Sequence, residues 1–323
     1  MMKKLWCRAK TNWSISRPIW IVILLGFTVA TSYGQYNGEC WVVSGGETIY
    51  KLYSNGQADP TVIPNLTQAS AAEVNPADGV VWIAVSAANT VYRYDPNSGA
   101  FSEIPDITRP NQIAINPADG SAWIAGLDAV KKVSGDGTQV VATISAHEPA
   151  VAVNPRDGSA WITNARGPIA RYDAAGNKVV DAPAMGEPKG VSVDYDGNAW
   201  IADSQHSVLM RVSASGQKLV EITDIPNPTS PRINPIDGSL WVVSQQSMLI
   251  NLGPDGTKTN EFLAGMAIVA ITLSPVDGGI WIADLLGETF QGEISKWSSA
   301  GQPLFKNPIP QPSSVSVGYW AGN

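Results

Sequence analysis

The chain has 323 residues, of which 44% are hydrophobic and 15% are charged, and its formal net charge is -7. This composition excludes an intrinsically disordered chain, and 30 glycines and 23 prolines without a Gly-X-Y period exclude collagen. With two cysteines and two histidines, the chain has too few ligands for a disulfide framework and little material for a histidine-rich zinc site.

The N-terminal segment has the order of a secretory signal. Residues 1–18 carry five basic side chains and no acid, and the apolar run from Ile19 to Ala30 follows them. That run is shorter than the roughly 20 residues that span a bilayer as a helix. We therefore expect residues 1–34 to be a secretory signal cut after Gly34, which leaves a secreted or periplasmic protein with no membrane span. An uncleaved signal anchor is the alternative.

Removal of this segment changes the charge of the protein. The five basic residues leave with it, so 16 Lys and Arg face 28 Asp and Glu, and the net charge becomes -12. Such an acidic surface repels nucleic acid and anionic lipid. Cys40 becomes the single cysteine, so stability must come from packing and not from an internal disulfide.

Seven copies of one unit fill the rest of the chain. Six carry the motif Asp-Gly-x-x-Trp, and a seventh carries Asn37-Gly38 in its place. The motif tryptophans recur every 38 to 41 residues, at Trp41, Trp82, Trp123, Trp161, Trp200, Trp241 and Trp281. A period near 40 with tight-turn glycines is typical of a β-propeller.

Each unit predicts four short antiparallel strands. An apolar strand runs into the Asp-Gly turn, a second strand begins at the tryptophan, an alternating third strand ends in another glycine turn, and a weaker fourth follows. The first unit lacks its own inner strand, and 312–317 supply one that aligns with 188–193. We therefore predict an all-β, seven-bladed propeller over residues 35–323, a single domain closed by pairing of the C-terminal strand with blade one.

The tryptophans and Cys40 have structural interpretations. Seven equivalent tryptophans are expected to pack between neighbouring blades, where large rings bury much area. Cys40 occupies a slot that holds Val, Ala, Leu or Ile in the other units, so we expect a buried small hydrophobe and not a nucleophile.

The unit between Pro188 and Asp203 resembles NHL-type propellers, and especially the virginiamycin B lyase (streptogramin lyase) group with its DGxxWFTE motif. The resemblance covers nearly the whole mature chain and is specific for architecture rather than activity. It implies a His general base and a magnesium ion held by carboxylates at the propeller mouth. The family writes this site as Glu-Pro-His-Gly, with a Glu one hairpin later.

The matching residues here are Glu187, Lys189 and Asp203, so a lysine stands at the family's base position. Glu187 and Asp203 are the candidate ligands for Mg²⁺ or Ca²⁺. Because lysine is protonated near neutral pH, the three form an ion pair more simply than a metal site. The candidate bases are Lys189 and His147, which precedes the equivalent Glu148 of the preceding blade.

Residues just before each inner strand should crowd one end of the central channel. The candidate ligand-binding residues at this mouth are Arg109, Asn111, Glu148, Glu187 and Lys189. The alternative is that they are solvated loop ends, and His206 is expected to be exposed. Hydrolase, zinc-protease and phosphate-loop motifs do not occur in the sequence.

Two functions of different classes remain. The first is an exported, non-catalytic propeller that acts as a binding or structural scaffold, a protein-interaction subunit of an extracytoplasmic assembly. The second is a divalent-metal-dependent lyase or lactonase of the streptogramin lyase or gluconolactonase-like type. Its site would comprise Glu187 and Asp203, joined by Asn164 or Asp284, around a cation.

Overall fold

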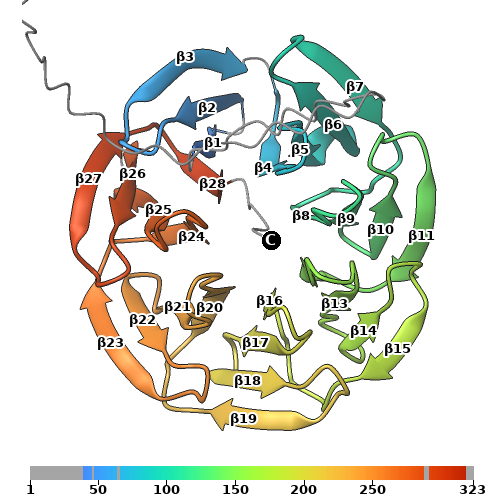
Figure 1. Cartoon of the computed structure of the whole chain (residues 1–323), viewed down its shortest axis with the longest axis vertical. Coiled ribbons are helices and arrows are strands. Elements are labelled where there is room, and N and C mark those ends of the chain that lie inside the picture. The colour runs from blue at the N-terminus through green and yellow to red at the C-terminus, as the bar shows by residue number, and fades with distance from the viewer. Residues whose placement is uncertain (1–38, 46, 64–65, 287–290, 318–323) are drawn as a thin grey trace, which may run out of the picture. The chain divides into compact units, whose positions relative to one another are not determined.

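Seven four-stranded antiparallel sheets stand as blades around a central channel (Figure 1). The computed structural model describes residues 39–317 except 46, 64–65 and 287–290. The predicted signal at 1–34 lies outside this part. The predicted seven-bladed, all-β architecture is confirmed.

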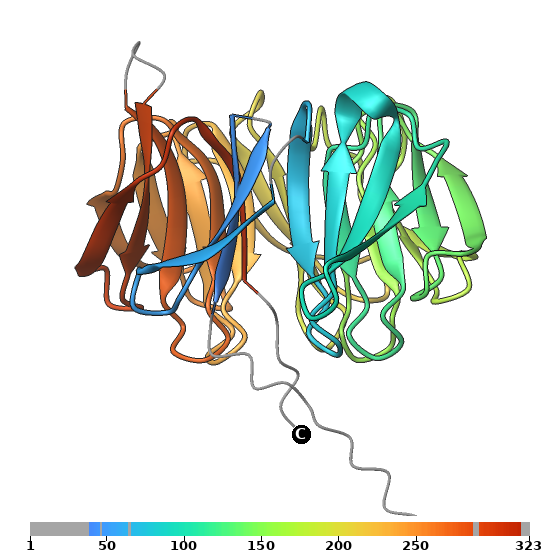
Figure 2. The same cartoon turned by 90° about the horizontal axis from the view of Figure 1, so that it is seen from above.

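Blades two to seven each follow the chain from the channel outward. Their strands are β4 (Ala69–Val74), β5 (Val81–Val85), β6 (Thr90–Asp95) and β7 (Ala100–Ile104); β8 (Gln112–Ile115), β9 (Ala122–Ala125), β10 (Ala129–Val133) and β11 (Val140–Ser145); β12 (Val151–Val153), β13 (Ala160–Ile162), β14 (Ala170–Tyr172) and β15 (Lys178–Asp181); β16 (Gly190–Val193), β17 (Ala199–Asp203), β18 (Val208–Val212) and β19 (Lys218–Ile222); β20 (Pro228–Ile233), β21 (Leu240–Ser244), β22 (Met248–Leu252) and β23 (Lys258–Leu263); β24 (Ile268–Leu273), β25 (Ile280–Leu286), β26 (Gln291–Trp297) and β27 (Pro303–Pro308). Figure 2 shows the blades from the side.

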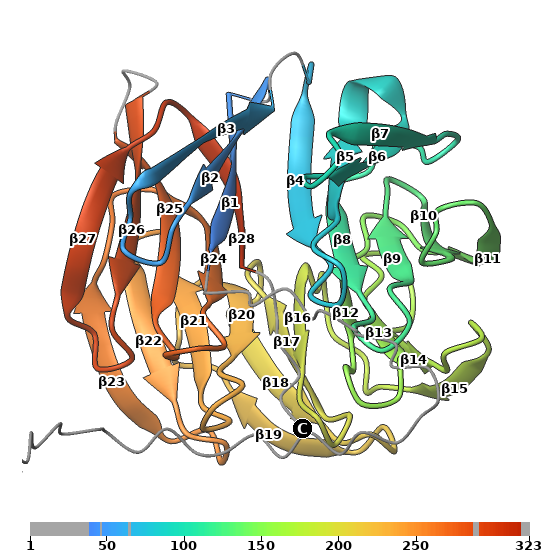
Figure 3. The ribbon, with the colours of Figure 1, turned by 45° about the horizontal axis from the view of Figure 1, so that its top comes forward.

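Blade one joins the two ends of the described chain. It consists of β1 (Cys40–Ser44), β2 (Thr48–Leu52), β3 (Ala58–Ile63) and, as its inner strand, β28 (Pro312–Val317). The register pairs Cys40 with Val317 and Val42 with Val315. Figure 3 shows β28 beside β1, with β24 and β4 as its neighbours around the channel. Ring closure by the C-terminal strand is therefore confirmed.

In blades two to seven, the turn after the inner strand differs in detail from the predicted tight Asp-Gly turn. In blade five, Gly197 has φ of +81°, whereas Asp196 keeps an ordinary negative φ. The loop contains five residues between β16 and β17, and the Asp194 amide donates to the Asn198 carbonyl across it at 2.9 Å. Only the glycine needs the left-handed conformation, so the turn is wider than the Asp-Gly pair alone suggested.

The motif tryptophans are buried between blades, as predicted. All seven are at most 2% exposed. Trp82 of blade two packs with Ile113 and Ile124 of blade three, and Trp281 of blade seven packs with Cys40 and Val42 of blade one. Each ring thus contributes to holding one blade against the next. Cys40 is fully buried, as expected for a small hydrophobe.

A basic side chain on the third strand strengthens several of these contacts. Lys296 lies over the Trp281 ring at 5.4 Å and pairs with Asp277 at 2.6 Å. Arg171 pairs with Asp157 at 2.7 Å and donates to the Ala214 carbonyl of the next blade at 3.3 Å. The cation therefore links the tryptophan, the turn aspartate and the neighbouring blade.

Helical structure is almost absent from the described residues. The helix found there is a single 3₁₀ turn, η1 (Ser86–Ala88). Within these ranges, no helix is long and apolar enough to cross a membrane.

Candidate functional site

The predicted mouth does not assemble as one cluster. Lys189 forms its ion pair with Glu148 of the preceding blade at 3.2 Å, and both side chains are about half exposed. This contact lowers the pKa of Glu148. The expected ion pair of Lys189 with Glu187 and Asp203 is therefore replaced by a bridge between blades four and five. As an exposed pair, it contributes little to stability.

The Asp203 carboxylate is occupied by its own blade. It is buried and accepts the backbone N–H of Glu187 at 2.8 Å, the backbone N–H of His206 at 3.0 Å, and a contact from His206 Nδ1 at 2.9 Å. Burial opposes ionisation, but these hydrogen bonds outweigh it, and the pKa of Asp203 is lowered. With the Gln205 amide in the orientation that satisfies both of its ends, its N–H donates to the Glu187 carboxylate at 2.5 Å.

The same position recurs as a latch in other blades. Asp284 accepts the N–H groups of Met266 at 3.0 Å and Ala267 at 2.7 Å. Asn164 accepts the N–H of His147 at 3.1 Å, and the Ser244 hydroxyl donates to the Pro226 carbonyl at 2.7 Å. The fourth residue of the Trp-x-x-x motif thus ties the entering loop to the second strand. This repetition favours a structural role for Asp203 over metal binding.

The remaining candidates at this mouth are dispersed. His147 Nδ1 contacts Asp128 Oδ1 at 2.9 Å, so this imidazole is oriented by an acid of blade three. Arg109 and Asn111 are exposed, and so is His206 despite its bond to Asp203. Arg109 and Glu148 both have positive φ, 45° and 43°, directly before a proline. Because this backbone recurs before several inner strands, it belongs to the scaffold rather than to one site.

Metal ligands do not gather in the described residues. No group of three or more His, Cys, Asp or Glu side chains there is placed to hold an ion. Glu187 and Asp203 do not fit a shared cation because the Asp203 oxygens already accept three hydrogen-bond contacts. A hard cation prefers several oxygens free to converge on it.

A cavity of about 390 Å³ lies inside the channel, toward the end where the inner strands finish. Most of its lining is apolar and comes from all seven inner strands and the residues after them, including Ile115, Val153, Val191 and Pro235. Tyr195 also lines it and is 37% exposed. The five residues predicted as a ligand site at the other mouth do not line this cavity.

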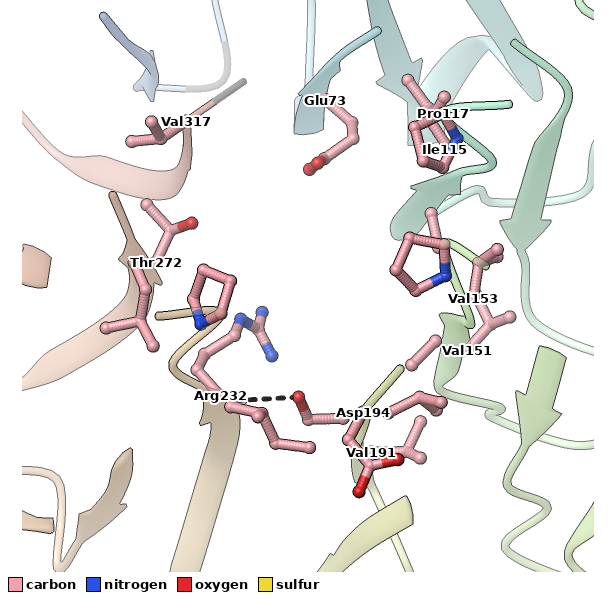
Figure 4. A pocket seen from close by; sticks show the side chains of 18 of the residues that line it. Glu73, Ile115, Pro117, Val151, Val153, Val191, Asp194, Arg232, Thr272 and Val317 are labelled. Atoms are coloured by element: carbon pink, nitrogen blue, oxygen red, sulfur yellow. Dashed lines mark hydrogen bonds between the residues drawn. The ribbon is translucent and has the colours of Figure 1, made fainter. Parts of the chain in front are cut away.

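Three charged residues line this cavity: Glu73 from β4, Arg232 from β20, and Asp194, which follows β16 (Figure 4). Asp194 is paired with Arg211 of its own blade at 3.0 Å. Glu73 and Arg232 stand at the same place in the repeat, directly opposite a motif tryptophan: Glu73 pairs with Trp82 and Arg232 with Trp241. The equivalent residues of the other blades are small: Ala114, Ala152, Ser192, Thr272 and Ser316. One acid and one base thus interrupt a ring of small residues.

Burial dominates the electrostatics of Glu73. It raises the pKa of this carboxyl from 4.5 to about 7, against the smaller opposing effects of the Ser316 hydroxyl and the Arg232 charge. The Ser316 hydroxyl donates to Glu73 at 2.9 Å. Burial also lowers the pKa of the Arg232 guanidinium, which Glu73 partly offsets. The two side chains therefore interact electrostatically across the cavity.

Sequence reasoning missed Glu73 and Arg232 because it examined the ends of the inner strands and not their middles. The signal was present in the aligned repeats. Between the two apolar residues near the end of the inner strand, the middle residue is Ser192 in blade five but Glu73 and Arg232 in blades two and six. Alternate side chains of an inner strand face the channel. A charged residue at one of these channel-facing positions indicates a function or a partner.

The fold and its channel define a seven-bladed β-propeller. A functionally unknown protein from Desulfotomaculum acetoxidans is similar, with a TM-score of 0.72 at 14% identity over 88% of this chain and 99% of that one. Virginiamycin B lyase from Staphylococcus aureus has a TM-score of 0.62 at 18% identity, over 76% and 88%. A chain of the mitotic checkpoint complex has a TM-score of 0.64 at 16% identity, over 76% and 79%.

These likenesses concern the fold. The predicted resemblance to virginiamycin B lyase propellers is confirmed at that level, and identities this low carry no activity with them. No protein-family model matches the sequence, and no curated protein matches it.

Proposed function

We propose that this chain is an exported, non-catalytic β-propeller that serves as a binding or structural scaffold, a protein-interaction subunit of an extracytoplasmic assembly. One observation carries the proposal. The carboxylate that the lyase resemblance would give to a cation, Asp203, is used as a latch within its blade. Lys189, at the family's base position, is bound to Glu148.

Exposed apolar side chains support a protein partner. Ile236 and Val276 are 58% and 60% exposed and occupy the same turn position in blades six and seven. Blades two and three carry only alanine there, at Ala77 and Ala118. Neighbouring apolar groups of this kind on one face are typical of protein interaction sites. The mitotic checkpoint complex, in which a similar fold occurs, is a protein assembly.

Partner binding is tested by purification of the exported protein from its native host, with mass spectrometry of the proteins that accompany it. The double variant Ile236→Glu/Val276→Glu should lose the main accompanying protein. A matched variant, Val179→Glu/Leu219→Glu, changes two equally exposed side chains on outer strands and should retain it. Loss from both variants, or from neither, contradicts an interaction at this face.

The lack of catalysis is tested separately with Lys189→His, which restores the family's histidine. Turnover of a streptogramin-type depsipeptide with Mg²⁺ should be undetectable in the natural protein and in the variant, because Asp203 remains engaged. The melting temperature should be unchanged by Mg²⁺ or Ca²⁺. Magnesium-dependent turnover by either protein would establish the lyase alternative.

A further inference from the structure

The charged groups of the central cavity are not paired with each other. Glu73 and Arg232 lie on opposite sides of the cavity in Figure 4, and no ion pair or hydrogen bond joins them. In the described chain, these two side chains make two hydrogen bonds to other protein groups. The Ser316 hydroxyl donates to Glu73, and the Arg232 guanidinium donates to the Pro231 carbonyl at 2.9 Å. A guanidinium has five N–H donors, so most of its capacity faces the cavity.

Several other polar side chains of this cavity are already bonded within the protein. Asp194 pairs with Arg211 of its own blade at 3.0 Å. The Gln112 amide exchanges two hydrogen bonds with the Val151 backbone, at 3.2 and 3.1 Å. The Ser192 hydroxyl accepts the N–H of Ile233 at 3.0 Å. Among the charged residues of the lining, Glu73 and Arg232 are therefore the two that form no ion pair within the described protein.

Unpaired charges in an apolar enclosure are costly, and natural proteins keep them where a ligand or a partner charge compensates them. If stability alone had shaped this ring, small residues would serve, as they do in the other five blades. The cavity volume of about 390 Å³ lies within the range of small-molecule sites. The exposed ring of Tyr195 in the lining gives this end of the channel contact with solvent.

We propose that the channel cavity binds a small zwitterion with an apolar body, such as an amino acid or a dipeptide, whose carboxylate pairs with Arg232 and whose ammonium pairs with Glu73. The planar guanidinium suits bidentate binding of a carboxylate. The apolar body lies against the valine, isoleucine and proline side chains of the inner strands. This site borders the apolar protein-binding face proposed above, because Pro235 of the lining precedes Ile236, but its charged binding groups are not part of that face.

The test is isothermal titration calorimetry of the exported protein with L-leucine and leucyl-leucine, two zwitterions of different length. N-acetyl-leucyl-leucine and leucyl-leucine amide keep the same body but lack the ammonium or the carboxylate. At least one zwitterion should bind, and each single-charge analogue should bind at least about tenfold more weakly, since a charged hydrogen bond is worth that much. No saturation by either zwitterion up to about 10 mM overturns the proposal, and so does equal binding of an analogue.

Variants locate the site. Glu73→Gln and Arg232→Lys should each weaken the zwitterion at least about tenfold, because one loses the charge and the other the planar fork. Ala152→Leu should abolish binding by filling the cavity without changing a charge, which keeps the test decisive if a charge variant folds poorly. Arg156→Met and Glu103→Gln alter exposed charges outside the cavity and should bind normally. Binding that survives Ala152→Leu and Arg232→Lys refutes the assignment.

Discussion

The half-buried Glu73 carboxyl should make stability fall as pH rises toward neutrality. In the folded protein its pKa is about 7, whereas the ordinary value is 4.5, so between these pH values the folded state holds a proton that the unfolded chain has lost. A carboxyl group whose pKa is raised by folding stabilises the folded state at low pH. The free energy of unfolding therefore falls as the pH rises to about 7 and is constant above that. The difference corresponds to at most about 3.5 kcal/mol, at about 1.4 kcal/mol per pH unit.

The perturbation is Glu73→Gln, which keeps an oxygen for the Ser316 hydroxyl and removes the titration. Urea unfolding followed by tryptophan fluorescence, at several pH values between about 5 and 8, gives the free energy of unfolding of each protein. The stability of the variant relative to the natural protein should rise between about pH 5 and pH 7 and stay level above that, whereas the matched variant Glu103→Gln should show no such rise.

Other carboxyl groups do not confuse the comparison. Asp157, Asp203 and Asp277 have lowered pKa values, so their stabilisation is present above the ordinary aspartate range and is lost only at lower pH. They are also common to both proteins and cancel in the difference. Parallel pH profiles for Glu73→Gln and the natural protein refute the buried-acid interpretation.

Four further results are expected. Deletion of Pro312–Asn323 removes the inner strand of blade one, so the product should be insoluble or strongly destabilised, and a truncated protein with unchanged urea midpoint contradicts closure. Asp284→Ala strips the acceptor from two loop N–H groups and should cost about 1–3 kcal/mol in urea unfolding, with Asp284→Asn milder. Lys296→Met breaks a pair whose cation is 3% exposed and should cost about 2–3 kcal/mol; a change within 0.5 kcal/mol would mean that the pair is dispensable. Cys40 is buried, which also raises the pKa of its thiol, so an aromatic disulfide reagent should label it only after unfolding, and rapid labelling of the native protein argues against this placement.

The architecture could be predicted from the sequence because seven copies of the unit each carry the same pattern of strands and turns. The tryptophan period gives the blade count, and the missing inner strand before Asn37 predicts the use of 312–317, which β28 confirms. The turn chemistry was only partly predictable. A glycine with positive φ was expected, but the number of residues in the loop depends on hydrogen bonds such as that between Asp194 and Asn198.

The site was less predictable because motif spacing places residues at a mouth without saying which atoms they contact. Lys189 and Asp203 are one hairpin apart, but Lys189 reaches the neighbouring blade and Asp203 turns back to its own loop. Glu73 and Arg232 are 159 positions apart in the sequence, and only closure of the ring brings them to one cavity. Long-range placement of this kind is a property of the fold rather than of local sequence.

The pairing of β28 with β1 also has a kinetic consequence. The contact between Cys40 and Val317 joins chain segments separated by nearly the whole propeller, so we expect this pairing, with its large loop-closure entropy, to form late in folding. Until that strand docks, Cys40 and Val42 lack their inner-strand partners and Glu73 lacks the Ser316 hydroxyl. A chain in which β28 has not docked, or from which it has been cleaved, has an open sheet edge and an incomplete cavity. Such a chain should be prone to aggregation and proteolysis.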